Sequence, residues 1–130
     1  YKRQFLVSLF AVLLFFFIRN ELVRGGPAIA TQDLVSLVNQ EEAVVLDVSP
    51  KEEFSEGHIV GAINIPYDKL DDRYPELSRY KENSMVVVCK MGSHSGAAGL
   101  LLKKRGFERV SRLRGGILEW RGQNLPVTKK

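Results

Sequence analysis

The sequence contains one cysteine, Cys89, in 130 residues. A single cysteine excludes an internal disulfide, and the lack of a second cysteine nearby argues against a Cys-x-x-Cys redox motif and against a zinc site. Histidine is nearly as scarce, since only His58 and His94 are present, and two histidines are too few for a metal constellation. We therefore expect a protein that works without a metal or another cofactor.

Charge is not in large excess either. The formal net charge is +4, and Lys2 and Arg3 carry two of these charges beside an apolar run. The rest of the chain is only mildly cationic, so a nucleic-acid partner is not expected.

Long hydrophobic runs are lacking except near the start of the chain. Residues 5–18 are all apolar apart from Ser8, and at ~1.5 Å per residue they span ~21 Å against a hydrocarbon core of ~30 Å. The run is short for a crossing, but the chain begins at Tyr1 rather than at a methionine, which suggests that the helix starts further upstream. We expect residues 1–22 to form a transmembrane anchor helix and residues 23–29 to form a linker.

A cleaved signal peptide is the main rival to an anchor. Ala28-Ile29-Ala30 resembles a cleavage site, but it lies beyond Arg19 and Arg24, too far from the apolar run to be used comfortably. We therefore favour an uncleaved anchor. Basic residues flank the run on both sides, so they do not fix its orientation.

Downstream of the linker, strand-length apolar runs alternate with helical patterns. Strands are expected at residues 43–48, 62–65, 85–88 and 110–113. Helices are expected after Thr31 and Ser49 as caps, in one or two turns within 68–80, over 95–105, and around Trp120. This alternation predicts a parallel sheet covered by helices on both faces. Ligands of such sheets bind beyond the carboxyl ends of the strands.

Cys89 lies at one of these strand ends. A polar loop containing Gly92 follows it, and Ser95 is placed to cap the next helix, whose first turns are kept slim by small residues. A loop that wraps back onto a helix start turns several N–H groups inward, and such groups stabilise an anion or a thiolate. The alternative is a buried structural cysteine, which is common for a lone cysteine, but the loop and the helix start favour the thiolate.

The residues around Cys89 and beyond it resemble the rhodanese family of sulfurtransferases, specifically its single-domain, membrane-anchored bacterial members. The resemblance runs from about residue 30 to residue 126. It is carried by Leu46-Asp47-Val48, Glu53-Phe54, Gly57-His58-Ile59, Gly61-Ala62-Ile63-Asn64-Ile65-Pro66, the Cys89 loop, Gly106-Phe107, and Leu113 through Gly115-Gly116 to Trp120. It implies a five-stranded parallel α/β domain at residues 30–128.

The length of the loop separates this family from related phosphatases on the same fold. Those enzymes use a seven-residue loop with arginine six positions after the cysteine, whereas that position here is Ser95. Two other positions depart from the family. Ser49 stands where many members have arginine after the Asp-Val pair, and His94 stands where many have arginine at the sixth loop position. Histidine still donates to an anion, but its charge depends on pH.

The resemblance implies that Cys89 is catalytic and carries sulfur as a persulfide. The substrate-binding residues would be the rest of the loop: Lys90, Met91, Gly92, Ser93 and His94. A small anionic donor such as thiosulfate would supply the sulfur, and a thiol, a protein acceptor or cyanide would remove it. Asp47 and His58 are expected to hold backbone rather than to act as acid or base.

Two other functions remain at this stage. A persulfide carrier that feeds a specific acceptor shares the same chemistry and differs only in which molecule receives the sulfur. The alternative of a different class is a membrane-tethered interaction module on the rhodanese fold with little or no catalysis. The intact cysteine loop weighs against it, because a scaffold has no chemical need for the thiol. The expected location is a bacterial inner membrane, crossed once, with the domain facing the cytoplasm, where reduced thiols are available for turnover.

Overall fold

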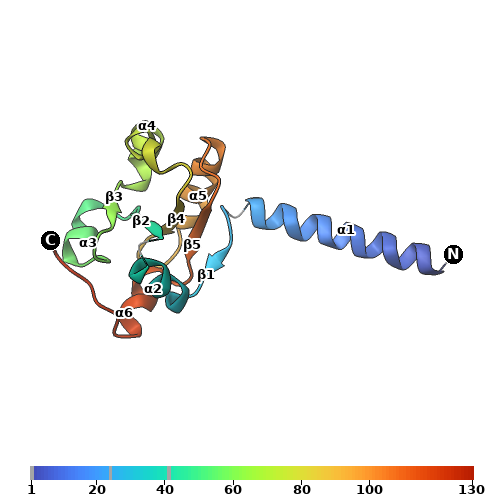
Figure 1. The fold of residues 1–130 in the computed structure, drawn as a ribbon, viewed down its shortest axis with the longest axis horizontal. Coiled ribbons are helices and arrows are strands. Elements are labelled where there is room, and N and C mark those ends of the chain that lie inside the picture. The colour runs from blue at the N-terminus through green and yellow to red at the C-terminus, as the bar shows by residue number, and fades with distance from the viewer. Residues whose placement is uncertain (1, 24, 41) are drawn as a thin grey trace.

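The computed structural model describes residues 2–23, 25–40 and 42–130. Within them, five strands form one parallel sheet in the order β1-β5-β4-β2-β3 (Figure 1). The strands are β1 (Ala28–Ile29), β2 (Ala43–Asp47), β3 (Ile63–Asn64), β4 (Ser84–Val88) and β5 (Val110–Leu113). The helices are α1 (Lys2–Val23), α2 (Thr31–Asn39), α3 (Lys51–Glu56), α4 (Leu70–Arg73), α5 (Ser95–Lys104) and α6 (Gly116–Gly122), with two 3-10 helices, η1 (Tyr67–Lys69) and η2 (Tyr74–Tyr80).

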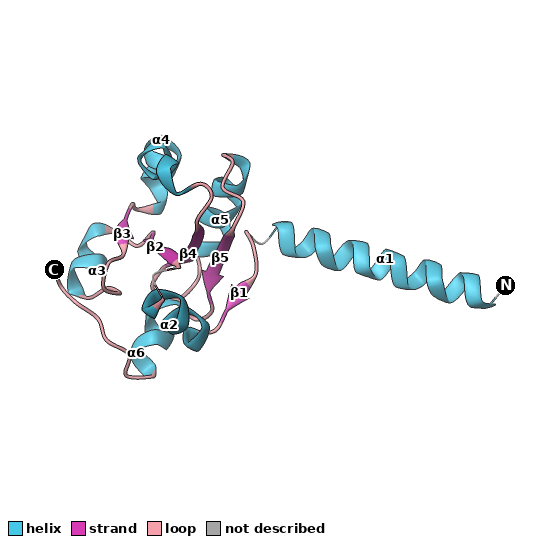
Figure 2. Ribbon diagram, viewed as in Figure 1, coloured by secondary structure: helices cyan, strands magenta, loops and turns pink. Residues whose placement is uncertain are grey.

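β4 is the central strand of the sheet and of the core. It pairs with β2 along the full length of both strands and with β5 on its other side. Successive side chains of a strand point to opposite faces, so Val86 and Val88 pack with α2 and α6, whereas Met85 and Val87 pack with α4 and α5. Figure 2 shows the same layers, with α2 and α6 together on one side of the sheet and α4 and α5 on the other. The predicted parallel sheet with helices on both faces is confirmed.

β1 is the element that the sequence did not reveal. It lies in the segment expected to be a linker and pairs with β5. Arg112 holds this edge, because its backbone N–H donates to Pro27 O (3.0 Å) and its Nε donates to Gly26 O (3.1 Å). A strand of two residues is too short to show a periodicity in the sequence. β1 is therefore recognised only by its pairing with β5.

Three helices do not have the residues expected from the sequence as their N-caps. Thr31 and Ser95 are the first helical residues of α2 and α5 rather than caps, and Pro50 rather than Ser49 precedes α3. Thr31 Oγ instead donates to Gln123 Oε1 (2.6 Å) and so ties α2 to the end of α6. The Thr31 hydroxyl is therefore used in a tertiary contact rather than in a local cap.

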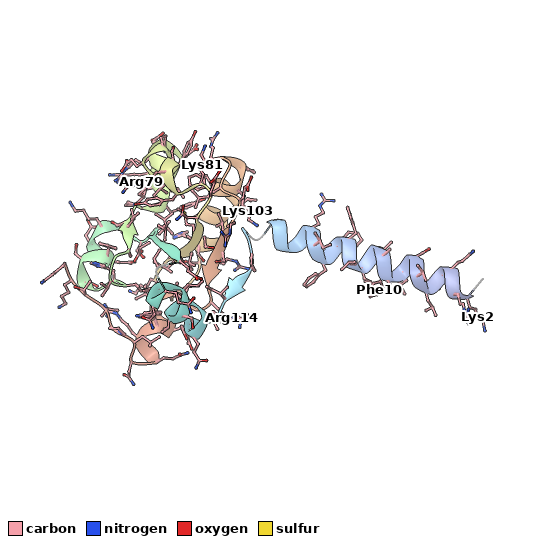
Figure 3. All side chains as sticks on the ribbon, in the orientation of Figure 1. Lys2, Phe10, Arg79, Lys81, Lys103 and Arg114 are labelled. Atoms are coloured by element: carbon pink, nitrogen blue, oxygen red, sulfur yellow. The ribbon has the colours of Figure 1, made fainter. Side chains whose placement is uncertain are left out.

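The expected transmembrane helix is wrong. The first segment does form a helix, α1, which extends away from the α/β domain (Figure 1), and Phe10 lies far from that domain (Figure 3). Within residues 2–23, 25–40 and 42–130, however, no helix combines the length and the apolarity needed to cross a bilayer. The physical reason is the short run at residues 5–18, which falls ~9 Å short of the hydrocarbon core. The expected location, a single crossing of a bacterial inner membrane, is therefore wrong as well. The expected segment boundaries at residues 22, 29 and 128 stay predictions.

Leu102 provides a test of the packing between α5 and the sheet. Its side chain is fully buried in the cluster that also holds Met85 and Val87. Leu102→Ala should lower the free energy of unfolding by about 2–5 kcal/mol, because it removes apolar contact and leaves a cavity. The matched control is Leu118→Ala, whose side chain is 47% exposed and whose loss should cost at most about 0.5 kcal/mol. Urea unfolding measures both, and equal costs would contradict this packing.

Candidate active site around Cys89

Cys89 lies directly after β4, at the carboxyl edge of the sheet. It continues the alternation of the strand, so its side chain belongs to the cluster on the α4 and α5 face together with Val87. The residue is 3% exposed. The thiol is therefore shielded from solvent.

The back of the loop is fixed by the start of α6. The N–H of Ile117 donates to Cys89 O (2.9 Å) and the N–H of Leu118 donates to Lys90 O (3.0 Å). Gly116 makes this approach possible, because it has φ +65° and a Cβ there would run into the carbonyl oxygens of Cys89 and Lys90. The glycine pair of the sequence is thus required both by its backbone conformation and by the space available.

The direction of these two carbonyls determines where the next amides point. In a planar trans peptide the C=O and the following N–H point in opposite directions. Since Cys89 O and Lys90 O face α6, the N–H groups of Lys90 and Met91 face away from α6. The side chain of Cys89 lies on the sheet face opposite α6, so both amides are turned toward the side that holds the sulfur.

The front of the loop is fixed by α5. Gly92 has φ +87°, a conformation that favours glycine, and its carbonyl accepts a hydrogen bond from the buried Ser95 Oγ (3.0 Å). The N–H of Ala98 donates to His94 O (3.0 Å), which joins the end of the loop to the helix. α5 begins at Ser95, so the loop from Cys89 to His94 has the six-residue length on which the sequence argument rested.

The other residues expected in the site differ from Cys89 in their exposure. The side chains of Lys90, Met91, Ser93 and His94 are exposed, with Met91 at 64%, and Gly92 is half-buried. These side chains are therefore open to solvent, whereas the Cys89 thiol is not. Their assignment as substrate-binding residues stays a prediction.

A second turn, at Asp47, lies beside the loop and is held just as firmly. The N–H of Ser49 donates to Asp47 Oδ1 (2.9 Å), and Asn64 Nδ2 donates to both Asp47 O and Ser49 O (3.0 Å each). The N–H of Val48 donates to Val88 O (2.9 Å), so this turn is attached to the strand that carries Cys89. Burial raises the pKa of Asp47 above its ordinary value of 3.8, and the hydrogen bonds from Ser49 oppose this rise. Asp47 therefore ties down backbone in this structure, as the sequence suggested.

His58 is held by contacts with the backbone and with a neighbouring ring. Its Nδ1 is 2.8 Å from Phe54 O, its ring stacks on the Phe54 ring at a centroid distance of 3.6 Å, and its backbone bridges to Thr128. The residue is 2% exposed. These contacts fit the structural role expected of it.

Two pockets adjoin the Cys89 loop on its two sides. The first, which we name the Lys90 pocket, is lined by Lys90, Asp47 and Ile117 among others. The second, which we name the His94 pocket, has a volume of about 520 Å³ and is lined by Val48, Pro50, Lys51, Glu52, Pro66, Tyr67, Asp68, Lys69 and His94. Within the described parts of the chain, no group of three or more His, Cys, Asp or Glu side chains is placed to hold a metal ion.

Sequence reasoning missed Tyr67 and the role of Gly116. The Tyr67 ring stacks on the His94 ring at a centroid distance of 5.2 Å and an interplanar angle of 2°. Nothing near Tyr67 in the sequence signals this contact, because the two residues are far apart in the chain. The Gly115-Gly116 pair is visible in the sequence as a turn, but its contact with the Cys89 loop requires the fold.

Fold and site together define an α/β domain whose single thiol lies within an amide-lined loop at a strand end. The sequence profile of one family, described as the rhodanese-like domain, matches residues 30–123. The chain therefore belongs to the rhodanese-like family.

Individual relatives agree with this assignment. The uncharacterized protein YibN of Escherichia coli K12 is 35% identical over 94 residues, which cover 72% of this chain and 66% of YibN, just under two thirds of that protein. A protein of Allochromatium vinosum named sulfurtransferase is 31% identical over 91 residues, 70% of this chain and 83% of that one. The crystal structure of a rhodanese-related protein from Thermoplasma volcanium superposes with a TM-score of 0.73 at 29% identity, over 80% of this chain and 99% of that one.

Gly116→Ala tests the contact between α6 and the Cys89 loop. Gly61→Ala is the matched control, because Gly61 also has a positive φ (+82°) but has no atom within 4 Å of a Cβ placed there. Both variants should lose the ~1–2 kcal/mol that a left-handed conformation costs a residue with a Cβ. Gly116→Ala should lose about 1–3 kcal/mol more, because the added carbon overpacks the loop. Equal free energies of unfolding for the two variants would refute the contact.

Asp47→Asn tests the buried carboxyl through the pH dependence of stability. Because the folded state binds the proton of Asp47 more tightly than the unfolded state does, the stability this group contributes is complete below pH 3.8 and is lost as the pH rises through its raised pKa. The difference in unfolding free energy, wild type minus variant, should therefore be largest below pH 3.8 and should decrease toward neutral pH. A difference that grows with pH would be inconsistent with a raised pKa. For the exposed Asp72, the substitution to Asn should change stability by at most about 0.5 kcal/mol throughout.

Proposed function

We propose that this protein is a sulfurtransferase that moves a sulfane sulfur from an anionic donor such as thiosulfate to a thiol, or to cyanide in an assay, through a persulfide on Cys89. The observation that carries the proposal is the buried Cys89 thiol at the start of a loop whose Cys89 and Lys90 carbonyl oxygens are held by the N–H groups of α6. Membership of the rhodanese-like family and the sulfurtransferase named in Allochromatium vinosum support it.

The first half-reaction transfers sulfur to the protein. The Cys89 thiolate attacks the outer, sulfane sulfur of thiosulfate, a new S–S bond forms, and the original S–S bond breaks with its electron pair leaving on sulfite. The outer sulfur of the resulting persulfide carries a negative charge. Preorganised N–H groups directed at that position would stabilise it, as an oxyanion hole stabilises oxygen.

The second half-reaction returns the enzyme to its starting state. An acceptor thiolate attacks the outer sulfur, a bond forms between the acceptor and that sulfur, and the Cys89 thiolate leaves. The two half-reactions share one covalent intermediate, so the kinetics should be of the ping-pong type. The chain's own groups supply the nucleophile and the hydrogen bonds for both steps.

The loop side chains would act on the donor before it reaches the thiol. Lys90, which lines a pocket beside the loop, would attract an anion by its charge. His94 would take the place of the arginine found in many family members, with a charge that varies with pH. We propose Lys90, Met91, Gly92, Ser93 and His94 together as the substrate-binding residues.

Mass spectrometry of the intact protein tests this function. After treatment with thiosulfate and removal of excess donor, the wild type should gain the mass of one sulfur atom, and this sulfur should map to Cys89. Cys89→Ser should gain none and should have no transfer activity, because hydroxyl oxygen cannot form the persulfide. If wild type and Cys89→Ser are equally unchanged with several sulfane donors, the domain is an interaction module and the proposal is wrong.

A further inference from the structure

The stack of Tyr67 on His94 is the contact beside the Cys89 loop that the proposed function leaves unused. The ring centroids are 5.2 Å apart and the ring planes are parallel within 2°, which is the offset-stacked geometry that aromatic pairs prefer. Both residues are exposed, and neither belongs to one of the two buried clusters. The stack is therefore not part of the hydrophobic core, and its role lies at the surface beside the loop.

The backbone of Tyr67 is held beside the loop by hydrogen bonds. Its N–H donates to Val48 O (3.0 Å), and the N–H of Lys69 donates to Pro66 O (2.9 Å) and closes η1. Val48 is in turn attached to β4, because its N–H donates to Val88 O (2.9 Å). Tyr67 is thus connected through one residue to the strand that leads into the Cys89 loop.

The side chain of His94 depends on Tyr67 for its orientation. Within residues 2–23, 25–40 and 42–130, the imidazole makes no hydrogen bond or ion pair, so the stack is the interaction that orients the ring. Stacking covers a face of the imidazole, whereas both ring nitrogens lie in the plane of the ring. The edge that carries these nitrogens therefore stays available to a ligand.

This arrangement provides what a histidine at this position lacks. The planar guanidinium of arginine, the residue that many family members have here, is always charged and preorganised for an anion. An exposed imidazole turns about its side-chain torsions, and its charge depends on pH. Holding the ring in one orientation reduces the conformational freedom that is lost when an anion binds.

The charge of His94 also determines the net charge of the His94 pocket. The other charged side chains of this pocket are Lys51 and Glu52 of α3 and Asp68 and Lys69 of η1. All four are exposed, and their two positive and two negative charges offset one another. Tyr67 is the remaining titratable group that faces the imidazole. Protonation of His94 therefore makes the pocket attractive to an anion, and loss of this proton removes the attraction.

Resting on the proposed function, we propose that Tyr67 is a positioning residue that holds the protonated His94 imidazole, by stacking, with its nitrogen edge available to the anionic sulfur donor. The donor belongs to the sulfur oxyanions, of which thiosulfate is the probe used here. His94 supplies the charge and Tyr67 supplies the orientation, so two residues share the task that one arginine performs alone. Binding of the donor then weakens as the pH rises.

The test measures the rate at which Cys89 acquires sulfur as a function of thiosulfate concentration, on the full chain. Tyr67→Leu should raise the half-saturating concentration about threefold to tenfold, the size of effect expected for a lost aromatic stack, and should change the limiting rate less than about twofold. Tyr67→Phe keeps the stacked ring and should stay within about twofold of the wild type. Tyr80→Leu is the matched control and should change neither value, because Tyr80 lines a pocket with Ala43 at the other end of the strands.

Two further measurements separate positioning from a merely structural role. In the His94→Ala background, Tyr67→Leu should change the half-saturating concentration less than about twofold, because no imidazole is left to orient. The half-saturating concentration of the wild type, divided by that of His94→Arg at the same pH, should rise between about pH 5 and 8, because histidine loses its charge in this range and arginine does not. This ratio cancels the titration of the Cys89 thiol, which both proteins share.

Three outcomes overturn the inference. Tyr67→Leu without effect on the half-saturating concentration, or with the same effect in the His94→Ala background, refutes the positioning role. A ratio of wild type to His94→Arg that stays constant with pH refutes the role of the imidazole charge. If Tyr67→Leu does not fold, Tyr67→Gln places a polar side chain at this exposed position and carries the same expected values. A wild type that acquires sulfur but fails these tests leaves the proposed function intact, whereas a wild type that acquires no sulfur removes both.

Discussion

The rest of the site depends on two hydrogen bonds, from the N–H groups of Ile117 and Leu118 to the carbonyl oxygens of Cys89 and Lys90. They fix the orientation of two peptide planes, and through these planes they decide which way the next amides point. They also join the central strand β4 to α6, which follows β5 in the sequence. Gly116 permits this contact because no side chain stands between the helix start and the loop.

The site therefore consists mainly of backbone, and the surrounding side chains hold that backbone in place. Ser95 Oγ and Asn64 Nδ2 each bond to carbonyl oxygens, and the buried Asp47 carboxyl accepts from the backbone of Ser49. None of these groups needs to react. A loop held in this way has its amides oriented before a charged sulfur forms, and preorganisation of this kind is the main source of electrostatic stabilisation in enzymes. The side chains of Lys90, Met91, Ser93 and His94 are different, because they are exposed to solvent.

The sequence predicted the parts of this structure that follow from local patterns. The buried run at residues 85–88, the glycines and the lone cysteine placed a thiol at a strand end within a parallel α/β sheet, and the structure has this arrangement. β1 was missed because two residues show no period. Two caps were misassigned because the Thr31 hydroxyl donates to the distant Gln123 and the Ser95 hydroxyl donates back to Gly92 O in the loop. The stacking of Tyr67 on His94 joins distant segments and has no local signal. The transmembrane prediction failed because no helix of the described residues is long and apolar enough to cross a bilayer.

The central claim is that Cys89 holds one sulfur as a covalent intermediate, and the release of sulfite without an acceptor tests it most directly. When the protein is mixed rapidly with excess thiosulfate and no thiol, the account predicts a burst of one sulfite per chain that then stops, because the persulfide has no acceptor. Release of no sulfite, or continued release well beyond one equivalent, would contradict the account.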